Sequence, residues 1–396
     1  MNYYVGIDVA SEKHNCSISN GKYDKAVIYS EFTFGNDLVG FEYLLSQLSL
    51  FGTPSDKKIH IGLEATGVYG DNLTQFLMCK GYEVTTFNPL IIKKSFQATT
   101  MRKTKTDKVD ARFIAHHTAK SEQDPDALAL YHNSELKSLC RRRFLLVKQR
   151  SQEKNRINAL VTRLFPEYRT FFSNMFIITS VSILTKWATA KDLATANLRA
   201  LSSLMNKTSR GRFSTEKAKE LKALAATSIG HYSAALGLEL QLALEHIALL
   251  DSHISRIEAE IKRIMSELDH PITTVPGIGV VLGAMIISEI GSFSNFSSPA
   301  KILSFAGLEP SVYQSGKFTP SSGSMVKRGS PYLRWALIQA ARCCAKFCPV
   351  FSHFCNKKLA EGKHFSVAIS HVAKKLTRIL FSISRKNISF DPYFAY

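Results

Sequence analysis

Two aspartates that follow a cluster of basic residues, Asp107 and Asp110, constrain the fold of this chain more than any other feature. They stand three residues apart in a helical pattern, so both carboxylates leave the same face of the expected helix. A bare acidic pair on a helix is usually solvated surface. This pair differs because two earlier acids, Asp8 and Glu64, each end a predicted strand. Four carboxylates gathered inside a basic protein need a counter-charge, and magnesium is a natural one.

The order of elements before these aspartates predicts a mixed sheet with helices on its faces. Helices are expected at 38–50, near 70–80 and at Asp107 and Asp110. Strands are expected at 3–9, 15–19, 26–34, 58–64 and 82–88, the second and third joined by an Asn20-Gly21 turn. Three strands followed by alternating helices and strands are the order of ribonuclease-H-like folds. In such a sheet the strands of Asp8 and Glu64 are neighbours.

Composition narrows the class of partner. The 396 residues suffice for two or three domains, and 51 Lys and Arg against 32 Asp and Glu give a net charge of +19. This excess predicts a polyanionic partner, with nucleic acid first and an acidic membrane surface second. We expect no membrane span, because no run of eighteen or more apolar residues exists. The amino terminus lacks the pattern of a secretory signal, and seven cysteines without a framework spacing favour a reducing cytoplasm.

Three of these cysteines, Cys344, Cys348 and Cys355, fall on one helical face. We interpret them as small packing residues of a core helix. A zinc site is the less favoured alternative, because structural zinc sites prefer CxxC pairs, which are absent here.

The middle of the chain predicts two long helical arms. Residues 134–165 are strongly basic, and Arg143, Arg150 and Glu153 interrupt their best heptad frame. Residues 240–268 carry a cleaner coiled-coil seam. Its core positions are Leu240, Ile247, Ile254, Ile261 and Leu268, with Leu250, Ile257 and Ile264 between them. Either the two segments pair as arms of one stalk, or the second pairs with its copy in another subunit. Residues 166–235 are expected to be helical with polar breaks, and their role is not assigned.

After Pro271 the sequence Thr274-Val-Pro-Gly-Ile-Gly279, followed by an apolar helix at 280–290, is similar to a helix-hairpin-helix turn. Backbone N–H groups at such a glycine-rich helix start can hold a DNA phosphate without reading sequence. The alternative is a tight turn between two core helices. A short helix at 299–308 and a polar loop follow. The segment Lys327-Arg-Gly-Ser-Pro-Tyr-Leu-Arg334 then leads into a long helix, and helices run to about residue 386.

The polar loop contains a candidate nucleophile, Ser315, which precedes Gly316. A serine hydroxyl needs a base or a metal to activate it. A loop serine beside a glycine can approach a phosphate closely, and nearby cations could neutralise that phosphate. Ser322-Gly323 is a rival pair, and the residues alone do not decide between the two serines. The candidate cations are Lys317, Lys327, Arg328 and Arg334.

Taken together, the motifs resemble the IS110 family of insertion-sequence transposases, the DEDD type, whose relatives include site-specific DNA invertases. The resemblance covers most of the chain. At the amino end it rests on Val5-Gly-Ile-Asp-Val9, Leu63-Glu-Ala-Thr-Gly-Val-Tyr69 and Lys105-Thr-Asp-Lys-Val-Asp-Ala111. At the carboxyl end it rests on Val275-Pro-Gly-Ile-Gly279, Phe305-Ala-Gly-Leu-Glu-Pro310, Gln314-Ser-Gly316 and Lys327-Arg-Gly-Ser-Pro-Tyr-Leu-Arg334.

The resemblance implies a fold that is α/β plus all-α. Its parts would be a RuvC-like domain at 1–125, a basic coiled-coil linker region at 126–270 and a helical transposase domain at 271–396. It also implies that Asp8, Glu64, Asp107 and Asp110 form a tetrad that binds Mg²⁺, and that Ser315 attacks DNA to form a transient phosphoserine bond. Further implications are donor and target DNA as substrates, a structured bridge RNA as guide, and assembly as homodimers or homotetramers. The region between the arms and the carboxyl tail are long for the family.

Several residues are expected to contact nucleic acid: Arg102, Lys103, Lys105, Arg141, Arg142, Arg143, Gly277, Gly279, Lys317, Lys327, Arg328 and Arg334. No GxxxxGK[ST] phosphate loop occurs, which agrees with strand exchange through an ester that conserves bond energy. Two alternatives remain open. One is a hydrolytic junction-resolving nuclease that uses the same acids with water as nucleophile. The other is a non-catalytic nucleic-acid scaffold, although its acids would then repel DNA without benefit.

Overall fold

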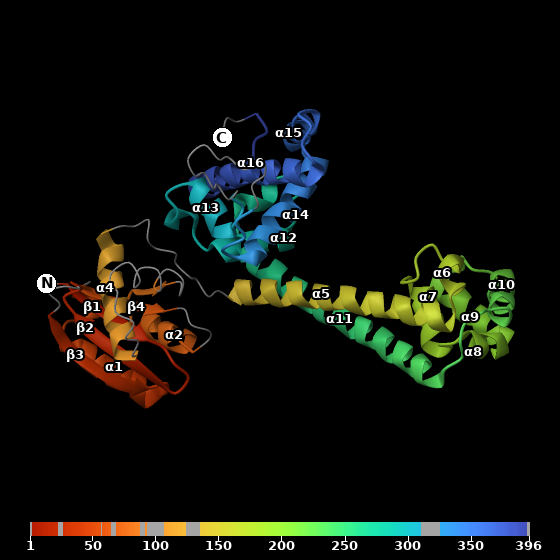
Figure 1. Cartoon of the computed structure of the whole chain (residues 1–396), viewed down its shortest axis with the longest axis horizontal. Helices are drawn as coiled ribbons and strands as arrows, with labels where there is room; N and C mark the ends of the chain where they lie inside the picture. Colours follow the sequence, from red (N-terminus) through yellow and green to blue (C-terminus); the bar gives the residue numbers. More distant parts are fainter. Residues whose placement is uncertain are drawn as a thin grey trace, which may run out of the picture. The chain divides into compact units, whose positions relative to one another are not determined.

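The computed structural model describes residues 2–22, 27–56, 58–64, 69–87, 92, 107–123, 135–309 and 325–393. The chain divides into two compact units, one made of Met1–Ser138 with Leu268–Tyr396 and the other of Leu139–Glu267 (Figure 1). Among the helices within these ranges, none is long and apolar enough to cross a membrane.

The amino-terminal part of the first unit is built on one mixed sheet with the strand order β3-β2-β1-β4-β5. The central strand β1 pairs antiparallel with β2 and parallel with β4; β2 pairs antiparallel with β3, and β4 pairs parallel with β5. The strand bounds are Tyr3–Asp8, Lys13–Ser19, Ile28–Gly35, Ile59–Glu64 and Val84–Phe87 for β1 to β5. This arrangement confirms the predicted mixed sheet and the predicted neighbourhood of the strands of Asp8 and Glu64.

One face of this sheet packs on helices α1 (Leu38–Ser49) and α2 (Asp71–Cys79). Because side chains alternate along a strand, the odd-numbered residues of β1 and β4 supply this face. They form one apolar cluster with residues of both helices: Val5, Ile7, Ile61, Leu63, Leu44, Leu48, Leu73 and Leu77. Burial of these side chains stabilises the sheet, at about 1.5–3 kcal/mol for each large apolar residue.

The other face is covered by α4 (Asp107–Gln123), which lies directly on β1 through a glycine. A Cβ atom built on Gly6 would overlap the backbone of Ala111 and Ala115 in α4. A Cβ on Gly62 in β4 would overlap the hydroxyl of Thr118. The two glycines therefore let the helix backbone approach the sheet more closely than any side chain would allow.

The predicted turn between β2 and β3 is longer than the two residues Asn20-Gly21. Asn20 and Val27 close the connection through a backbone hydrogen bond of 3.1 Å from Asn20 N to Val27 O. The Asn20 side chain also accepts from Val27 N at 3.1 Å. Gly21 has a φ of +74°, which glycine adopts without steric cost. Asparagine and glycine are thus used as turn residues, but residues 23–26 between them and β3 lie outside the described part of the chain.

The second unit is a stalk of two antiparallel helices, α5 (Glu135–Leu164) and α11 (Ala234–Leu268). Leu146 of α5 packs against Leu250 and Ile254 of α11 in one apolar cluster. Of the two pairings left open by the sequence, the structure therefore has the two segments paired as arms of one stalk.

The residues that interrupt the heptad frame of α5 make the polar contacts across this stalk. Arg143 donates from Nη2 to Glu258 Oε1 at 2.7 Å, and Arg150 donates from Nη1 to Asp251 Oδ1 at 2.6 Å. His246 Nδ1 lies 3.2 Å from Glu153 Oε1. These pairs fix the register between the arms, although ion pairs that remain partly exposed to solvent contribute at most about 1 kcal/mol each.

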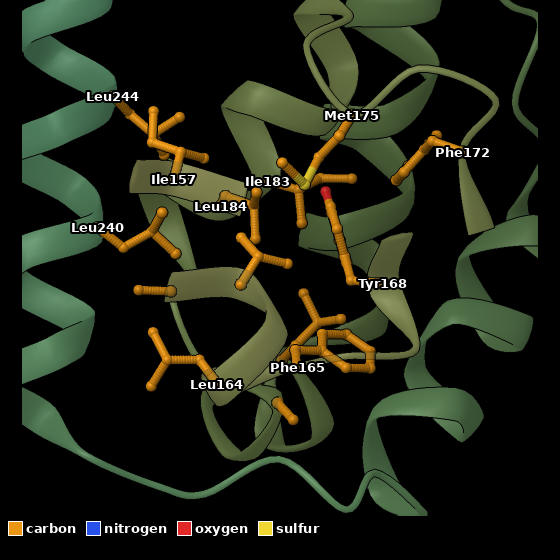
Figure 2. Packing of buried hydrophobic residues seen from close by; sticks show 14 of the residues in the cluster. Ile157, Leu164, Phe165, Tyr168, Phe172, Met175, Ile183, Leu184, Leu240 and Leu244 are labelled. Atoms are coloured by element: carbon orange, nitrogen blue, oxygen red, sulfur yellow. The ribbon is translucent and has the colours of Figure 1, made fainter. Parts of the chain in front are cut away.

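Between the arms, residues 166–233 form a cluster of short helices that we call the tip module. Its helices are α6 (Tyr168–Phe171), α7 (Ile178–Lys186), α8 (Ala190–Thr195), α9 (Leu198–Ser209) and α10 (Thr215–Ala226). Figure 2 shows Tyr168, Phe172 and Ile183 packed with Leu240 and Leu244 of α11 in one core. The predicted helical character with polar breaks is confirmed, and the module shares its core with the ends of both arms.

The carboxyl-terminal part of the first unit is helical, as predicted. Its long helix α14 packs on α12, α15 and α16. The helix bounds are Val280–Ile290 for α12, Pro299–Ala306 for α13, Pro331–Phe347 for α14, Pro349–Ala360 for α15 and Phe365–Lys386 for α16. Cys344, Cys348 and Cys355 are free and buried, and burial raises the pKa of Cys344 to about 12. The three thiols therefore serve as small packing groups here, as the sequence indicated.

Candidate active site

The register of the sheet brings two of the predicted acids together. Ile7 of β1 pairs with Leu63 of β4, so Asp8 and Glu64 are the next pair along the two parallel strands. Neighbouring strands lie about 4.8 Å apart, and residues at paired positions share a face. Asp8 and Glu64 are two residues beyond Gly6 and Gly62, so both lie on the face that α4 covers. Both side chains are half-buried.

The direction of α4 brings its first turn toward the same strand ends. Tyr4 of β1 packs with Ala119, while Gly6 lies against Ala111 and Ala115. Moving along β1 toward Asp8 therefore means moving along α4 toward its amino terminus. That first turn carries Asp107 and Asp110. Asp110 is half-buried, and the side chain of Asp107 lies outside the described part of the chain.

The donor chemistry of this corner of the sheet fits magnesium. Mg²⁺ is typically held by one or two carboxylates, with waters and substrate phosphates completing its octahedron. Asp8 and Glu64 supply two carboxylates on adjacent strands. Within the ranges that the structure describes, no group of three or more His, Cys, Asp or Glu side chains is close enough to hold a metal ion. Among the described side chains, the carboxylates available for a magnesium ion at this corner are therefore the pair from the sheet, Asp8 and Glu64.

An ion pair joins α4 to β3, an edge strand of the sheet. Arg112, two residues after Asp110, donates from Nη2 to Glu31 Oε2 of β3 at 2.7 Å, and Ser17 donates to Glu31 Oε1 at 3.2 Å. The hydrogen bond from Arg112 lowers the pKa of the Glu31 carboxyl below its usual value. This contact stabilises the packing at neutral pH, and its contribution is lost as the pH falls through that lowered pKa.

In the carboxyl-terminal part, two short segments at 305–309 and 326–330 lie side by side. Backbone hydrogen bonds join them from Val326 N to Glu309 O at 3.0 Å, from Lys327 N to Gly307 O at 3.2 Å and from Ser330 N to Phe305 O at 3.0 Å. We call this pair of segments the loop bracket. It holds Glu309 and Val326 side by side. Residues 310–324, with Ser315, Lys317 and Ser322, lie outside the described part of the chain.

The loop bracket depends on two glycines and one arginine. Gly307 and Gly329 have φ values of +66° and +107°, and a Cβ on either would overlap a carbonyl oxygen of the opposite segment. Arg334 donates from Nη1 to the carbonyl oxygens of Ala306 at 2.9 Å and of Lys327 at 3.1 Å. Arg334 was predicted to contact nucleic acid, and the structure shows that its guanidinium holds the bracket together. Lys327 and Arg328 are exposed.

The buried side chain of Glu289 binds Ser330 at the end of the bracket. Ser330 begins α14 and accepts a hydrogen bond from Leu333 N at 3.1 Å. Its hydroxyl donates to Glu289 Oε2 of α12 at 2.7 Å, and Glu289 is only 2% exposed. The serine of the Lys327-Arg-Gly-Ser-Pro motif is thus a helix cap that ties α14 to α12.

The glycine-rich turn before α12 contains one glycine packed against another helix, Gly277, and one with free space beside it, Gly279. Gly277 has a φ of +98°, and its Cα faces the backbone of Cys343 and Cys344 in α14. Gly279 caps the start of α12, and a Cβ built on it would meet nothing within 4 Å. Gly277 therefore acts as a packing glycine between two helices, and Gly279 is the position with backbone open to a partner.

The remaining predicted cations fall into two groups. Arg142 is exposed on α5, whereas Arg143 is tied to Glu258 across the stalk. Arg141, on the same turn, is half-buried. Arg143 was predicted to bind nucleic acid, and the structure shows its guanidinium in an ion pair with Glu258 within the stalk. Arg102, Lys103 and Lys105 lie outside the described residues.

Sequence reasoning missed one signal at this site. Each strand that ends in an acid has a glycine two positions earlier, in Gly6-Ile-Asp8 and in Gly62-Leu-Glu64. The repeat of this spacing on two strands marks the face on which a helix backbone comes close. The loop bracket was also missed, because Gly307 was interpreted only as the end of a short helix and Arg334 as a contact to nucleic acid.

Two family models match this chain, one over its amino-terminal part and one over its carboxyl-terminal part. The model of the DEDD domain of IS110 type, described as a transposase, matches residues 5–166. The model described as transposase IS116/IS110/IS902 family matches residues 269–356. The chain is similar to the pilin gene-inverting protein of Moraxella bovis, with 26% identity over 396 residues, 98% of this chain and 97% of the relative.

The chain is also similar to a second relative and to one solved structure. The IS116 uncharacterized 44.8 kDa protein of Streptomyces clavuligerus is 25% identical over 297 residues, 73% of each chain. Among solved structures, a Thermus thermophilus RuvC in complex with a Holliday junction substrate aligns over 31% of this chain and 95% of its own, at 10% identity and a TM-score of 0.23. Because the two family models cover the sheet domain and the helical domain in the family's order, the chain belongs to the IS110 family of transposases, enzymes that recombine DNA.

Proposed function

We propose that this transposase cuts and rejoins DNA strands through a transient phosphoserine bond made by Ser315, with Mg²⁺ held at the acidic corner of the sheet. The observation that carries the metal part is the register of β1 and β4, which places Asp8 beside Glu64 under the first turn of α4. The loop bracket supports the serine part, because it fixes both ends of the segment that contains Ser315.

The serine step balances without an external energy source. The Ser315 oxygen forms a bond to a DNA phosphorus, the hydroxyl loses its proton, and the bond from phosphorus to a deoxyribose oxygen breaks. That oxygen takes up a proton and leaves as a hydroxyl. A deoxyribose hydroxyl of another strand then attacks the phosphoserine and releases the serine. One phosphodiester is exchanged for another, so no nucleotide triphosphate is consumed.

The acids and the exposed cations have separate tasks in this proposal. Asp8 and Glu64, with Asp107 and Asp110 from α4, would hold Mg²⁺, which neutralises charge that develops on a phosphate. Lys327 and Arg328 leave the bracket at the exposed surface and would contact the DNA backbone. The carboxylates alone would repel DNA, so their placement at one corner favours a catalytic role over the scaffold alternative.

We also propose a bridge RNA as guide and a homodimer or homotetramer as the active assembly. The net charge of +19 supports binding of a second polyanion, since it exceeds what a few DNA contacts require. Base pairing by such an RNA would select the target, while the protein binds backbones without reading sequence.

Trapping the covalent intermediate tests the proposal. The protein is incubated with a labelled DNA substrate and Mg²⁺ and then denatured, and the adduct is digested and mapped by mass spectrometry. We expect a nucleotide on the peptide that contains Ser315. Cleaved DNA without any protein adduct, in a reaction that runs to completion, would support the hydrolytic nuclease instead.

Substitution of Asp8 by asparagine is expected to reduce strand cleavage by at least about a hundredfold, because it removes one of the carboxylates that bind the metal. Removal of divalent cations with a chelator should have the same effect on the unmodified protein. The matched control is Glu42→Gln, which neutralises an exposed carboxylate on α1. Full activity of the Asp8 variant would contradict a metal role for this corner.

A further inference from the structure

The tip module lies in the part of the chain between the two regions that the family models match. The two family models match residues 5–166 and 269–356, so neither covers residues 167–268. The module nevertheless has a well-formed core, with Leu201, Met205, Ala218 and Leu221 of α9 and α10 fully buried. Such a core indicates a fixed shape, so the surface of the module is presented in a defined way.

The tip module carries a large excess of positive over negative charge. Residues 166–233 contain ten Lys and Arg against four Asp and Glu, a formal net charge of +6. The four acids are all engaged inside the module. Glu167 accepts from Ile229 N at 3.1 Å, and Asp192 accepts from the hydroxyl of Thr189 at 2.7 Å in a capping box. Lys217 and Lys219 pair with the two remaining acids, Glu220 at 2.7 Å and Glu216 at 2.9 Å.

Most of the other cations also have internal partners. The ammonium groups of Lys186 and Lys191 lie over the rings of Trp187 and Tyr232, and Lys222 donates to the carbonyl oxygen of Ala196. Arg169 donates to the hydroxyl of Thr162 at 3.0 Å. Within residues 166–233, all of which the structure describes, the cations without an ion pair, an aromatic ring or a hydrogen-bond partner are Arg199, Lys207, Arg210 and Arg212.

Three of these four gather where α9 turns into α10, and we call Lys207, Arg210 and Arg212 the basic corner. All three are exposed, and the Cα of Gly211 between the two arginines faces open space. No carboxylate of the module is available to neutralise them. An exposed turn with three positive charges is complementary to the backbone of a polyanion.

The basic corner is held rigidly. Arg210 has a φ of +56°, a left-handed conformation that is uncommon for a residue with a side chain. Gly211 N donates to Asn206 O at 2.9 Å, and Phe213 N donates to the Ser209 hydroxyl at 2.9 Å. The ring of Phe213 packs edge-on against Phe172 of the core at 5.6 Å between centroids. The cations thus project from a fixed turn, which reduces the entropy lost on binding.

We propose that the basic corner binds the backbone of duplex DNA, as a contact at the far end of the stalk. DNA is the partner because recombination of DNA is the activity of this family, and the contact does not depend on the serine step. The 30 residues of α5 span about 45 Å. A duplex bound at the basic corner would therefore lie about 45 Å from the base of the stalk. This distance equals the length of roughly 13 base pairs of DNA.

Charge removal at the corner tests this proposal in the full-length protein. The variant Lys207→Gln, Arg210→Gln, Arg212→Gln is titrated by fluorescence anisotropy onto a DNA duplex of about 40 base pairs at several salt concentrations. We expect binding at about 0.1 M salt to weaken at least about tenfold, and the slope of log affinity against log salt to fall by about 3. The control variant is Arg169→Gln, Lys186→Gln, Lys191→Gln, which removes the same charge from cations with internal partners.

Each outcome decides the question. Weakened DNA binding of the corner variant alone supports the proposal. Equal weakening of both variants would show that only the overall charge matters, and unchanged binding would show that the corner is solvated surface. Loss of affinity for an RNA duplex of the same length, with DNA binding intact, would assign the corner to RNA and overturn the proposal. Circular dichroism verifies that the variants are folded, and the serine adduct can be measured independently.

Discussion

Replacement of Ser315 by alanine is expected to abolish both the covalent protein–DNA adduct and strand transfer, a loss of roughly a thousandfold or more. The hydroxyl oxygen is the atom that bonds to phosphorus in the proposed step, and a methyl group cannot replace it. The loss should appear in a strand-transfer assay and, on a denaturing gel with labelled DNA, as the absence of the slow-migrating adduct. Binding of DNA should be unchanged, because the backbone contacts remain.

The matched control is Ser322→Ala, which removes the rival hydroxyl seven residues further along the same segment. It should retain the adduct and strand transfer. If Ser322→Ala is inactive and Ser315→Ala is active, the nucleophile is Ser322. If neither substitution affects cleavage, water is the nucleophile and the enzyme cuts DNA by hydrolysis with the same acids.

Substitution of Gly6 by alanine is expected to destabilise the sheet domain by about 3 kcal/mol or more. The new methyl group would overlap the backbone of Ala111 and Ala115, so α4 would have to move away from β1. This movement would carry Asp110 away from Asp8 and lower the activity of the protein that remains folded. Calorimetry should show an earlier unfolding transition, and hydrogen exchange should show loss of protection in β1 and α4.

Gly70→Ala serves as the control in the same domain. A Cβ at Gly70 would meet Val9 at an ordinary contact distance of 3.4 Å, and the residue has a φ of −89°. We expect its effect on stability to remain within about 1 kcal/mol. If Gly6→Ala were equally mild, α4 could not lie against β1 as closely as the structure shows, and the shared corner of the acids would lose its main support.

Much of the sheet could be predicted because its information is local. Short apolar strands such as Val5 to Ile7 and Ile59 to Leu63 are recognisable by composition, and each is followed by an acid. The strand order then follows from the common topology of such a run. The register of β1 and β4, which pair from Tyr3 and Ile59 onward, then places Asp8 beside Glu64.

Contacts between residues far apart in the sequence could not be predicted in the same way. The distance between α4 and β1 depends on the absence of a side chain at Gly6, and glycine in a strand has several other interpretations. Arg143 and Arg150 looked like breaks in a heptad seam, and only their acidic partners more than a hundred residues later explain them. Arg334 looked like a phosphate ligand because the carbonyl groups that it binds are invisible in a sequence.

The antiparallel pairing of the stalk limits which insertions its two helices can accept. Each ion pair across it joins a residue of one arm to a residue of the other, as in Arg143 with Glu258 and Arg150 with Asp251. Seven residues added to one arm alone would shift every such pair out of alignment. Seven added to both arms at the same level would preserve the pairing and move the distal helices outward by about 10 Å. Changes in reach should therefore occur as paired insertions of one heptad, in discrete steps.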